Sequence, residues 1–213
     1  MDLILEQVTK QIKGRTVLDH IDLQLQSGTV YGLVGDNGSG KTMLLRAISG
    51  LIRLNEGRIL WNGCELHKAF PVIPNQGILI ENAGLYPDLS GLQNLMLLAG
   101  VNHKIYEKEV REAILRVGLD PDDKKKFRKY SLGMKQRLLI AQAIMEQPDL
   151  ILLDEPTNAL DENGIALVRR IILEEKSRGA LILLASHNKD DIRATADTVF
   201  RVSCGAVFPE EPS

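Results

Sequence analysis

Gly35-Asp36-Asn37-Gly38-Ser39-Gly40-Lys41-Thr42 is the stretch that decides the fold of this 213-residue chain. The apolar run at residues 30–34 precedes it and predicts a buried strand, while residues 43–48 predict a helix that ends at Gly50. A glycine-rich turn between a strand and a helix, with the spacing G-x-x-x-x-G-K-[ST], forms a cradle for phosphate. Glycines let successive backbone N–H groups point at one anion, and the helix N-terminus adds partial positive charge. The stretch therefore predicts nucleotide binding.

Each polar group of this cradle has an expected task. We expect Lys41 to neutralise the β- and γ-phosphates of the nucleotide and the Thr42 hydroxyl to hold Mg²⁺. The remaining nucleotide contacts are expected from Gly35, Asp36, Asn37, Gly38, Ser39, Gly40 and Met43. The alternative, a glycine-rich turn with a surface lysine, is less favoured because the flanking strand and helix are also predicted.

Composition narrows the classes of protein that this chain can represent. Hydrophobic residues make up 44% and charged residues 25%, as in ordinary globular domains. The net charge of -2 argues against a generic nucleic-acid surface, so no nucleic-acid partner is expected. Cys64 and Cys204 lie far apart, which favours reduced thiols and a cytoplasmic location. The N-terminus does not resemble a signal peptide and no run of about 18 apolar residues occurs, so we expect membrane contact only through a partner.

Periodicity predicts an α/β fold with a helical insert. Alternating apolar residues at 3–8 and 17–25 predict a small antiparallel sheet at the start of the chain. Residues 149–154 and 180–185 are too apolar for strands with a solvated face and therefore predict a buried parallel sheet. Helical spacing dominates residues 92–145. We therefore expect a nucleotide-binding α/β core at 1–81 and 147–213 and a helical insert at 82–146. The basic run at 124–129 favours a solvated surface over a binding patch, and the tail at 209–213 should be loose.

A second polar site follows two of the predicted core strands. Asp154 and Glu155 come directly after the four apolar residues at 150–153, where Asp154 would reach Mg²⁺ through water and Glu155 would polarise an attacking water molecule. His187 follows the next buried strand, and strand ends in such sheets converge on the ligand crevice, so it is a candidate γ-phosphate contact. A carboxylate pair or a histidine at the end of a strand is more often structural than catalytic when it is seen alone. Because a phosphate cradle occurs in the same chain, we favour a catalytic role here.

Five motifs in this order resemble the ATP-binding cassette (ABC) ATPases. They are the phosphate cradle, Tyr130-Ser131-Leu132-Gly133-Met134-Lys135-Gln136-Arg137, Asp154-Glu155-Pro156-Thr157, Asn158-Ala159-Leu160-Asp161 and Ser186-His187. The resemblance implies a P-loop NTPase core with a mostly parallel sheet, an N-terminal antiparallel β subdomain and an inserted α-helical subdomain. It also implies a head-to-tail dimer in which Ser131 and Gly133 of one copy contact the γ-phosphate held by the other, with Asp161 at the dimer seam. Without the other motifs, Ser131 would be taken as an ordinary helix cap.

Three departures from the usual family pattern matter for function. The signature segment at 130–134 differs from the usual L-S-G-G-Q, and Glu81 stands where most members carry glutamine. Both features are similar to the bacitracin- and lantibiotic-resistance branch, and an anionic Glu81 is expected to strengthen Mg²⁺ coordination. The aromatic residue that usually stacks on adenine falls near Ile12, which offers only an apolar contact. We therefore expect weak base discrimination and modest nucleotide affinity.

The favoured function is the ATPase subunit of a transporter whose membrane-spanning permease is a separate polypeptide. The resemblance implies ATP hydrolysis with Mg²⁺, a second cassette that is identical or paralogous, and export of an antimicrobial peptide or drug. The chain would then lie at the cytoplasmic face of the membrane. Alternatives are a soluble ABC ATPase acting on DNA or ribosomes, a P-loop kinase and a cassette without turnover. Long coiled coils and zinc-binding cysteines do not occur, the signature segment has no role in a kinase, and Lys41, Asp154, Glu155 and His187 are all present.

Overall fold

The computed structural model describes residues 1–80 and 84–210, so Glu81 lies outside the described residues. The strands are β1 (Asp2–Ile12), β2 (Arg15–Gln26), β3 (Val30–Val34), β4 (Glu56–Trp61), β5 (Cys64–Glu65), β6 (Gln76–Leu79), β7 (Leu150–Asp154), β8 (Leu181–Ala185), β9 (Thr198–Ser203) and β10 (Ala206–Glu210). The helices are α1 (Lys41–Ile48), α2 (Gly91–Asn102), α3 (Glu107–Arg116), α4 (Leu132–Ile144), α5 (Glu162–Ser177) and α6 (Lys189–Thr195), with a short 3-10 turn at Phe127–Lys129.

Two sheets form the framework. The larger sheet has the strand order β10-β9-β3-β8-β7-β6, and only β10 runs antiparallel to its neighbour. The smaller sheet, β2-β1-β4-β5, is antiparallel throughout. The predicted mostly parallel core and N-terminal antiparallel sheet are therefore both confirmed.

Alternation along β7 and β8 assigns each face of the large sheet to a different hydrophobic core. Leu150 and Leu152 pack with α1 and the small sheet, whereas Ile151 and Leu153 pack with α2 to α6. Successive side chains of a strand point to opposite faces, so a strand that is covered on both sides must be apolar at every position. The unbroken apolar run in the sequence is thus explained by burial on both faces.

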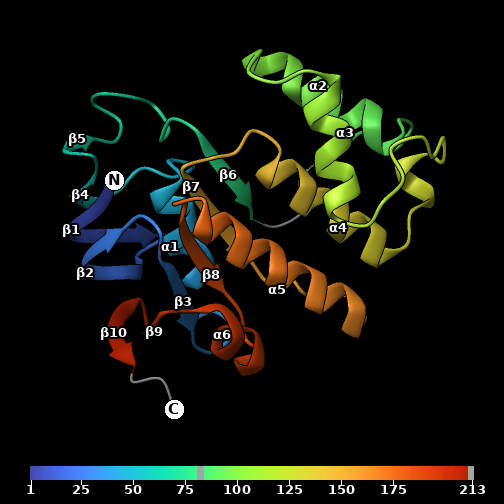
Figure 1. Cartoon of the computed structure of the whole chain (residues 1–213). Coiled ribbons are helices and arrows are strands. Elements are labelled where there is room, and N and C mark those ends of the chain that lie inside the picture. The colour runs from blue at the N-terminus through green and yellow to red at the C-terminus, as the bar shows by residue number, and fades with distance from the viewer. Residues whose placement is uncertain (81–83, 211–213) are drawn as a thin grey trace.

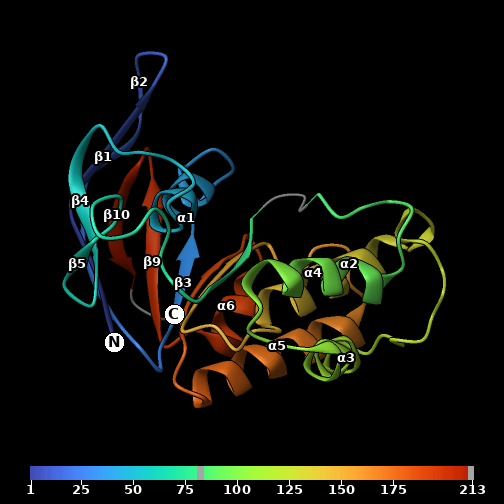
Figure 2. The ribbon, with the colours of Figure 1, turned by 90° about the horizontal axis from the view of Figure 1, so that it is seen from above.

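Helices α2, α3 and α4 lie together on one side of the molecule, and the small antiparallel sheet lies on the other (Figure 1). The same separation is visible from above, where α5 runs below α2 and α4 in the view (Figure 2). The expected helices between the two halves of the core are thus present. The division of the chain into units at residues 81 and 147 stays a prediction.

The end of the chain differs from expectation. Pro209 and Glu210 belong to strand β10, where they pair with Phe200 and Val199, so the predicted loose tail is wrong for these two residues. Proline lacks a backbone donor, and an edge strand accepts it because one side of the strand needs no partner.

The basic run at 124–129 is mostly exposed, as expected. Cys64 and Cys204 are free and exposed, and within the described residues no helix is long and apolar enough to cross a membrane.

Candidate nucleotide-binding site

The glycine-rich loop joins the carboxyl end of β3 to the first residue of α1. Gly35, Gly38 and Gly40 have φ angles of 149°, 79° and 119°, a backbone region that residues with side chains rarely adopt. Gly40 caps α1 without any side-chain hydrogen bond, and the first turn of α1 contains no acidic residue. The N-terminal N–H groups of α1 therefore have no anionic side chain of their own helix beside them, which suits them to a phosphate group.

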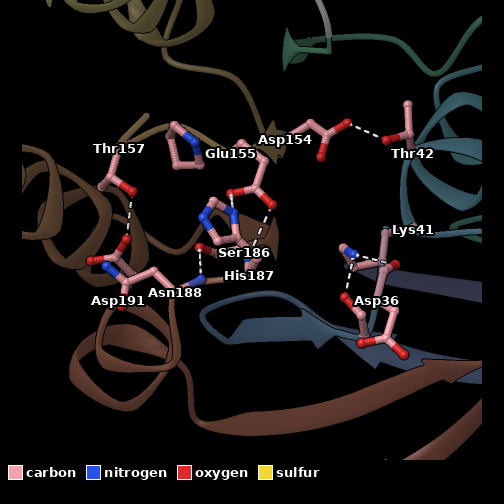
Figure 3. A network of polar contacts seen from close by, with 12 residues as sticks. Asp36, Lys41, Thr42, Asp154, Glu155, Thr157, Ser186, His187, Asn188 and Asp191 are labelled. Carbon is pink, nitrogen blue, oxygen red and sulfur yellow. Dashed lines mark hydrogen bonds and ion pairs between the residues drawn. The ribbon is translucent and has the colours of Figure 1, made fainter. Parts of the chain in front are cut away.

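Lys41 is buried within this loop. Its Nζ donates hydrogen bonds to the carbonyl oxygens of Gly35, at 2.6 Å, and Asp36, at 3.1 Å (Figure 3). Only 6% of the residue is exposed, and burial of an ammonium group is costly unless polar partners surround it. The ammonium group thus lies against the curled loop, and its predicted contact with phosphate stays a prediction.

Thr42 and Asp154 bring the first and second predicted sites together. The Thr42 hydroxyl donates to Oδ2 of Asp154 at 2.5 Å, which joins the start of α1 to the end of β7 (Figure 3). A hydroxyl and a carboxylate are the hard oxygen ligands that Mg²⁺ prefers, and Mg²⁺ usually takes few protein ligands alongside substrate phosphates. Within residues 1–80 and 84–210, no cluster of three or more His, Cys, Asp or Glu side chains could hold a metal alone. The donor set therefore fits Mg²⁺ bound together with phosphate oxygens.

Glu155 and His187 form a direct pair that the sequence did not predict. Oε1 of Glu155 accepts from the His187 backbone N–H at 2.9 Å, and Oε2 lies 2.7 Å from the ring nitrogen Nδ1 (Figure 3). Because a carboxylate only accepts, the ring proton lies on Nδ1 and leaves Nε2 free to face another group. The His187 side chain is 61% exposed and that of Glu155 21% exposed, so water can reach both.

The backbone of Glu155 is strained. Its φ angle is 51°, in the left-handed region, which costs a residue other than glycine about 1–2 kcal/mol. Its N–H donates to the carbonyl oxygen of Ala185 at 2.8 Å, so the strained residue is attached to the end of β8. Backbone strain of this kind persists where the surrounding structure holds it, and it is common at functional sites.

Ser131 and Asp161, which are expected at a dimer seam, lie at the starts of α4 and α5 and not in the phosphate loop. Ser131 caps α4 by accepting from the Met134 N–H at 3.1 Å, and it is exposed. Asp161 caps α5 by accepting from the Gly164 N–H at 2.9 Å, and Arg137 lies 3.2 Å from the same carboxylate oxygen. In both overall views the start of α4 lies apart from α1 (Figures 1 and 2). Both side chains have a capping role within one copy, and their predicted contact with a second copy stays a prediction.

Three further predicted positions lie as follows. Gly133 is half-buried in the first turn of α4. Met43 is half-buried in the first turn of α1. Ile12 ends β1 with 39% of its surface exposed, as an apolar contact for a base would require. Their predicted contacts with nucleotide stay predictions.

Several polar contacts around the site were not predicted from the sequence. The buried carboxylate of Asp191 accepts hydrogen bonds from Thr157 and Arg169, which ties the loop after β7 to α5 and α6. The Gln136 side chain donates to two carbonyl groups of the same loop. Ser39 Oγ in the phosphate loop is buried without a partner in the described structure. Ser39, Gln136 and Thr157 belonged to motifs noticed in the sequence, whereas Arg169 and Asp191 did not. Contacts between distant segments leave no local pattern.

A cavity of about 680 Å³ adjoins the phosphate loop. Its lining includes Asp36 and Asn37 from the loop, His187, and the residues Lys189 and Ile192 from α6. This volume lies within the range of about 300–1,000 Å³ of small-molecule sites. The first half of the loop and the exposed His187 ring therefore border one hollow.

Comparisons with known proteins agree with this geometry. The model of the ABC transporter family matches residues 18–158. YybJ, an ABC transporter ATP-binding protein of Bacillus subtilis (strain 168), is 48% identical over 96% of this chain and 94% of its own length. SrtF, a lantibiotic transport ATP-binding protein of Streptococcus pyogenes, is 33% identical over 98% of this chain and 90% of its own length. A bacterial ABC transporter cassette solved as a dimer has the same fold, with a TM-score of 0.89 and 22% identity over 99% of each chain. The chain therefore belongs to the ABC transporter family, as an ATP-binding ATPase subunit.

Proposed function

We propose that this chain hydrolyses Mg²⁺-ATP at a site that a second cassette completes, and that hydrolysis drives transport through a separate membrane permease. One observation carries the hydrolytic part of the proposal. The Thr42–Asp154 hydrogen bond and the Glu155–His187 pair lie at adjoining strand ends beside the phosphate loop, which supports their proposed roles as metal ligands, base and phosphate contact. Positioning and electrostatic stabilisation are what phosphoryl transfer requires from a protein.

Each residue has a role in the proposed mechanism. The N–H groups of the loop and Lys41 would bind the β- and γ-phosphates and stabilise the charge that develops on them. Thr42 and, through water, Asp154 would hold Mg²⁺, with Glu81 as a further ligand; the metal would neutralise phosphate charge. Glu155 would orient the attacking water, because each carboxylate oxygen has a second lone pair beyond its bond to His187. His187 would link the γ-phosphate to the dimer seam, donating from Nε2 in the doubly protonated form of its ring, in which both nitrogens are donors.

The proposed partners follow from the family. The second cassette would place the exposed Ser131 at the N-terminus of α4, with Gly133, against the γ-phosphate of the first copy, and Asp161 would lie at the seam. Ser131 is exposed and its helix N-terminus contains no acidic residue in the first turn, so the N-terminal charge of α4 is free to face an anion. A glycine at position 133 presents no side chain there.

The cargo and location are proposed by analogy with named relatives. The likeness to a lantibiotic transport ATP-binding protein supports export of an antimicrobial peptide or drug. A permease that contacts the helical part of the chain near Glu81 would hold it at the cytoplasmic face of the membrane. Co-purification with a co-expressed membrane permease would test this assignment, and absence of the chain from native membranes would contradict it.

The hydrolytic assignment is tested by Glu155→Gln. This change keeps the side-chain shape but removes the basic carboxylate, so ATP affinity should stay within threefold of wild type while turnover falls at least 100-fold. Equilibrium ATP binding and phosphate release measure the two effects separately. Glu162→Gln, at an exposed position in the first turn of α5, is the matched control and should leave both unchanged. Wild-type turnover by Glu155→Gln would remove Glu155 from the proposed role.

A further inference from the structure

The loop that carries Glu155 is held from the side of α4 by one glutamine. The Nε2 group of Gln136 lies 3.1 Å from the carbonyl oxygen of Glu155 and 3.0 Å from that of Pro156. A side-chain amide nitrogen carries two hydrogens, so Gln136 can donate one to each carbonyl. The two residues are separated by 19 positions in the chain, and the contact joins a helix to the loop after β7.

The hydrogen bond from Gln136 adds to the contacts that hold Glu155 in its strained backbone conformation. Glu155 has a φ angle of 51°, its N–H is bound by Ala185 and its carboxylate by His187. Its carbonyl group is bound by Gln136 and by the N–H of Asn158, at 3.2 Å, and Asn158 belongs to the same loop. Gln136 is therefore the group on α4 that fixes the carbonyl side of Glu155 to a rigid element. A peptide plane that is free to rotate would carry the Glu155 carboxylate away from its present direction.

We propose that Gln136 is a positioning residue for hydrolysis, which holds the strained backbone of Glu155 so that its carboxylate faces the attacking water. The proposal rests on the proposed role of Glu155. Gln136 lies on the same helix that begins at the exposed Ser131, so a displacement of α4 would be transmitted to the orientation of Glu155. It would act without touching nucleotide, because both of its bonds end on backbone carbonyls.

The proposal predicts that Gln136 affects the rate of chemistry and not the binding of ATP. In the full-length chain, Gln136→Leu removes both donors at similar volume, so kcat should fall at least tenfold with KM and directly measured ATP affinity within twofold of wild type. Gln136→Glu would place an acceptor against two carbonyl oxygens, and it should lower kcat at least as far. Such a split between kcat and KM is the signature of an interaction that matters in the transition state.

The control comes from the same helix. Gln142 is half-buried on α4, and its Oε1 has no hydrogen-bond partner in the described structure. Gln142→Leu makes the same chemical change without touching the loop of Glu155, so kcat should stay within twofold of wild type. A loss of activity that came only from a weakened α4 would instead appear in both variants and follow their melting temperatures.

A double-variant cycle decides whether Gln136 acts through Glu155. Single-turnover hydrolysis is measured with enzyme in excess for wild type, Gln136→Leu, Glu155→Gln and the double variant. If Gln136 works by orienting the carboxylate, Gln136→Leu should slow the Glu155→Gln enzyme less than twofold, since effects of residues that act as a unit are not additive. The proposal is overturned if Gln136→Leu keeps wild-type kcat, raises KM instead, or slows both backgrounds by the same factor. Wild-type turnover by Glu155→Gln alone would instead contradict the proposed function.

Discussion

Two glycines of the phosphate loop are needed for different physical reasons. A Cβ on Gly35 would lie 2.2 Å from the backbone oxygen of Val202 in β9, so this position has no room for a side chain. A Cβ on Gly38 would meet nothing within 4 Å, and only its φ of 79° disfavours other residues. The spacing of glycines in the sequence predicts both positions, but the close approach of β9 to the loop required the structure.

The difference can be measured by thermal unfolding. Gly38→Ala should cost about 1 kcal/mol from its left-handed backbone, or about 2–4 °C in a domain of this size. Gly35→Ala must also displace the loop or β9, so its melting temperature should fall by at least twice as much. Equal decreases in the two variants would contradict the assigned cause.

Thr42 allows a residue-scale test of the magnesium assignment. Thr42→Val keeps the branched shape but removes the hydroxyl that bonds Asp154, so the Mg²⁺ concentration for half-maximal hydrolysis should rise about tenfold, the equivalent of one ligand interaction of about 1.4 kcal/mol. Thr42→Ser keeps the hydroxyl and should stay near wild type. ATP affinity measured in a chelator should be the same in all three proteins, and an unchanged Mg²⁺ dependence of Thr42→Val would contradict the assignment.

At the scale of elements, Asp197 joins three segments at the amino ends of β3 and β9. Its carboxylate accepts from the Val30 N–H at 2.9 Å and from Lys176 at 2.5 Å, and its own N–H donates to the Val30 oxygen. Burial opposes ionisation of Asp197, but the hydrogen bonds from Lys176 and Val30 outweigh it and hold the pKa below its ordinary value of 3.8. The ionised carboxylate therefore stabilises the junction.

This shift in pKa predicts a pH dependence of stability. A carboxyl group whose pKa is lower in the folded state contributes stability above 3.8, and the contribution is lost as the pH falls through the folded value. Asp197→Asn should therefore lower the free energy of unfolding by no more than about 1 kcal/mol near pH 7, because the group is partly exposed. The difference from wild type should shrink below pH 3.8 in urea titrations. A difference that grows as the pH falls would contradict the assigned sign.

The elements themselves could be predicted from the sequence because each has a local signal. The apolar runs of β7 and β8 reflect burial on both faces, and alternation in β1 and β2 reflects burial on one. The left-handed backbone of Glu155 and its bonds to His187 and Gln136 have no local signal, because they depend on how β7, β8 and α4 pack. The sequence therefore predicted the motifs whose side chains lie at the strand ends beside the phosphate loop, and the structure added how these side chains hold one another.

At the scale of the whole molecule, one copy contains the phosphate loop with the candidate ligands Thr42 and Asp154, and the candidate base Glu155 follows Asp154 directly. The exposed start of α4 lies apart from α1 (Figures 1 and 2). Within a copy Ser131 caps α4, and Asp161 caps α5 and pairs with Arg137. The account therefore requires a second copy, oriented head to tail, to bring α4 to the nucleotide. Several other residue types could cap α4 in place of Ser131, and capping does not require this residue to be exposed. The exposure of Ser131 is therefore explained by a contact with a second copy and not by capping.

The mass of Glu155→Gln in solution, measured by light scattering with and without Mg²⁺-ATP, tests this requirement most directly. Without nucleotide the protein should have the mass of one 23.6 kDa chain, and with Mg²⁺-ATP the mass should double, since hydrolysis can no longer release the two copies. Adding Ser131→Arg should keep the protein at the mass of a single chain. A protein that is saturated with ATP yet remains a single chain, with turnover insensitive to Ser131→Arg in the otherwise wild-type enzyme, would contradict the account.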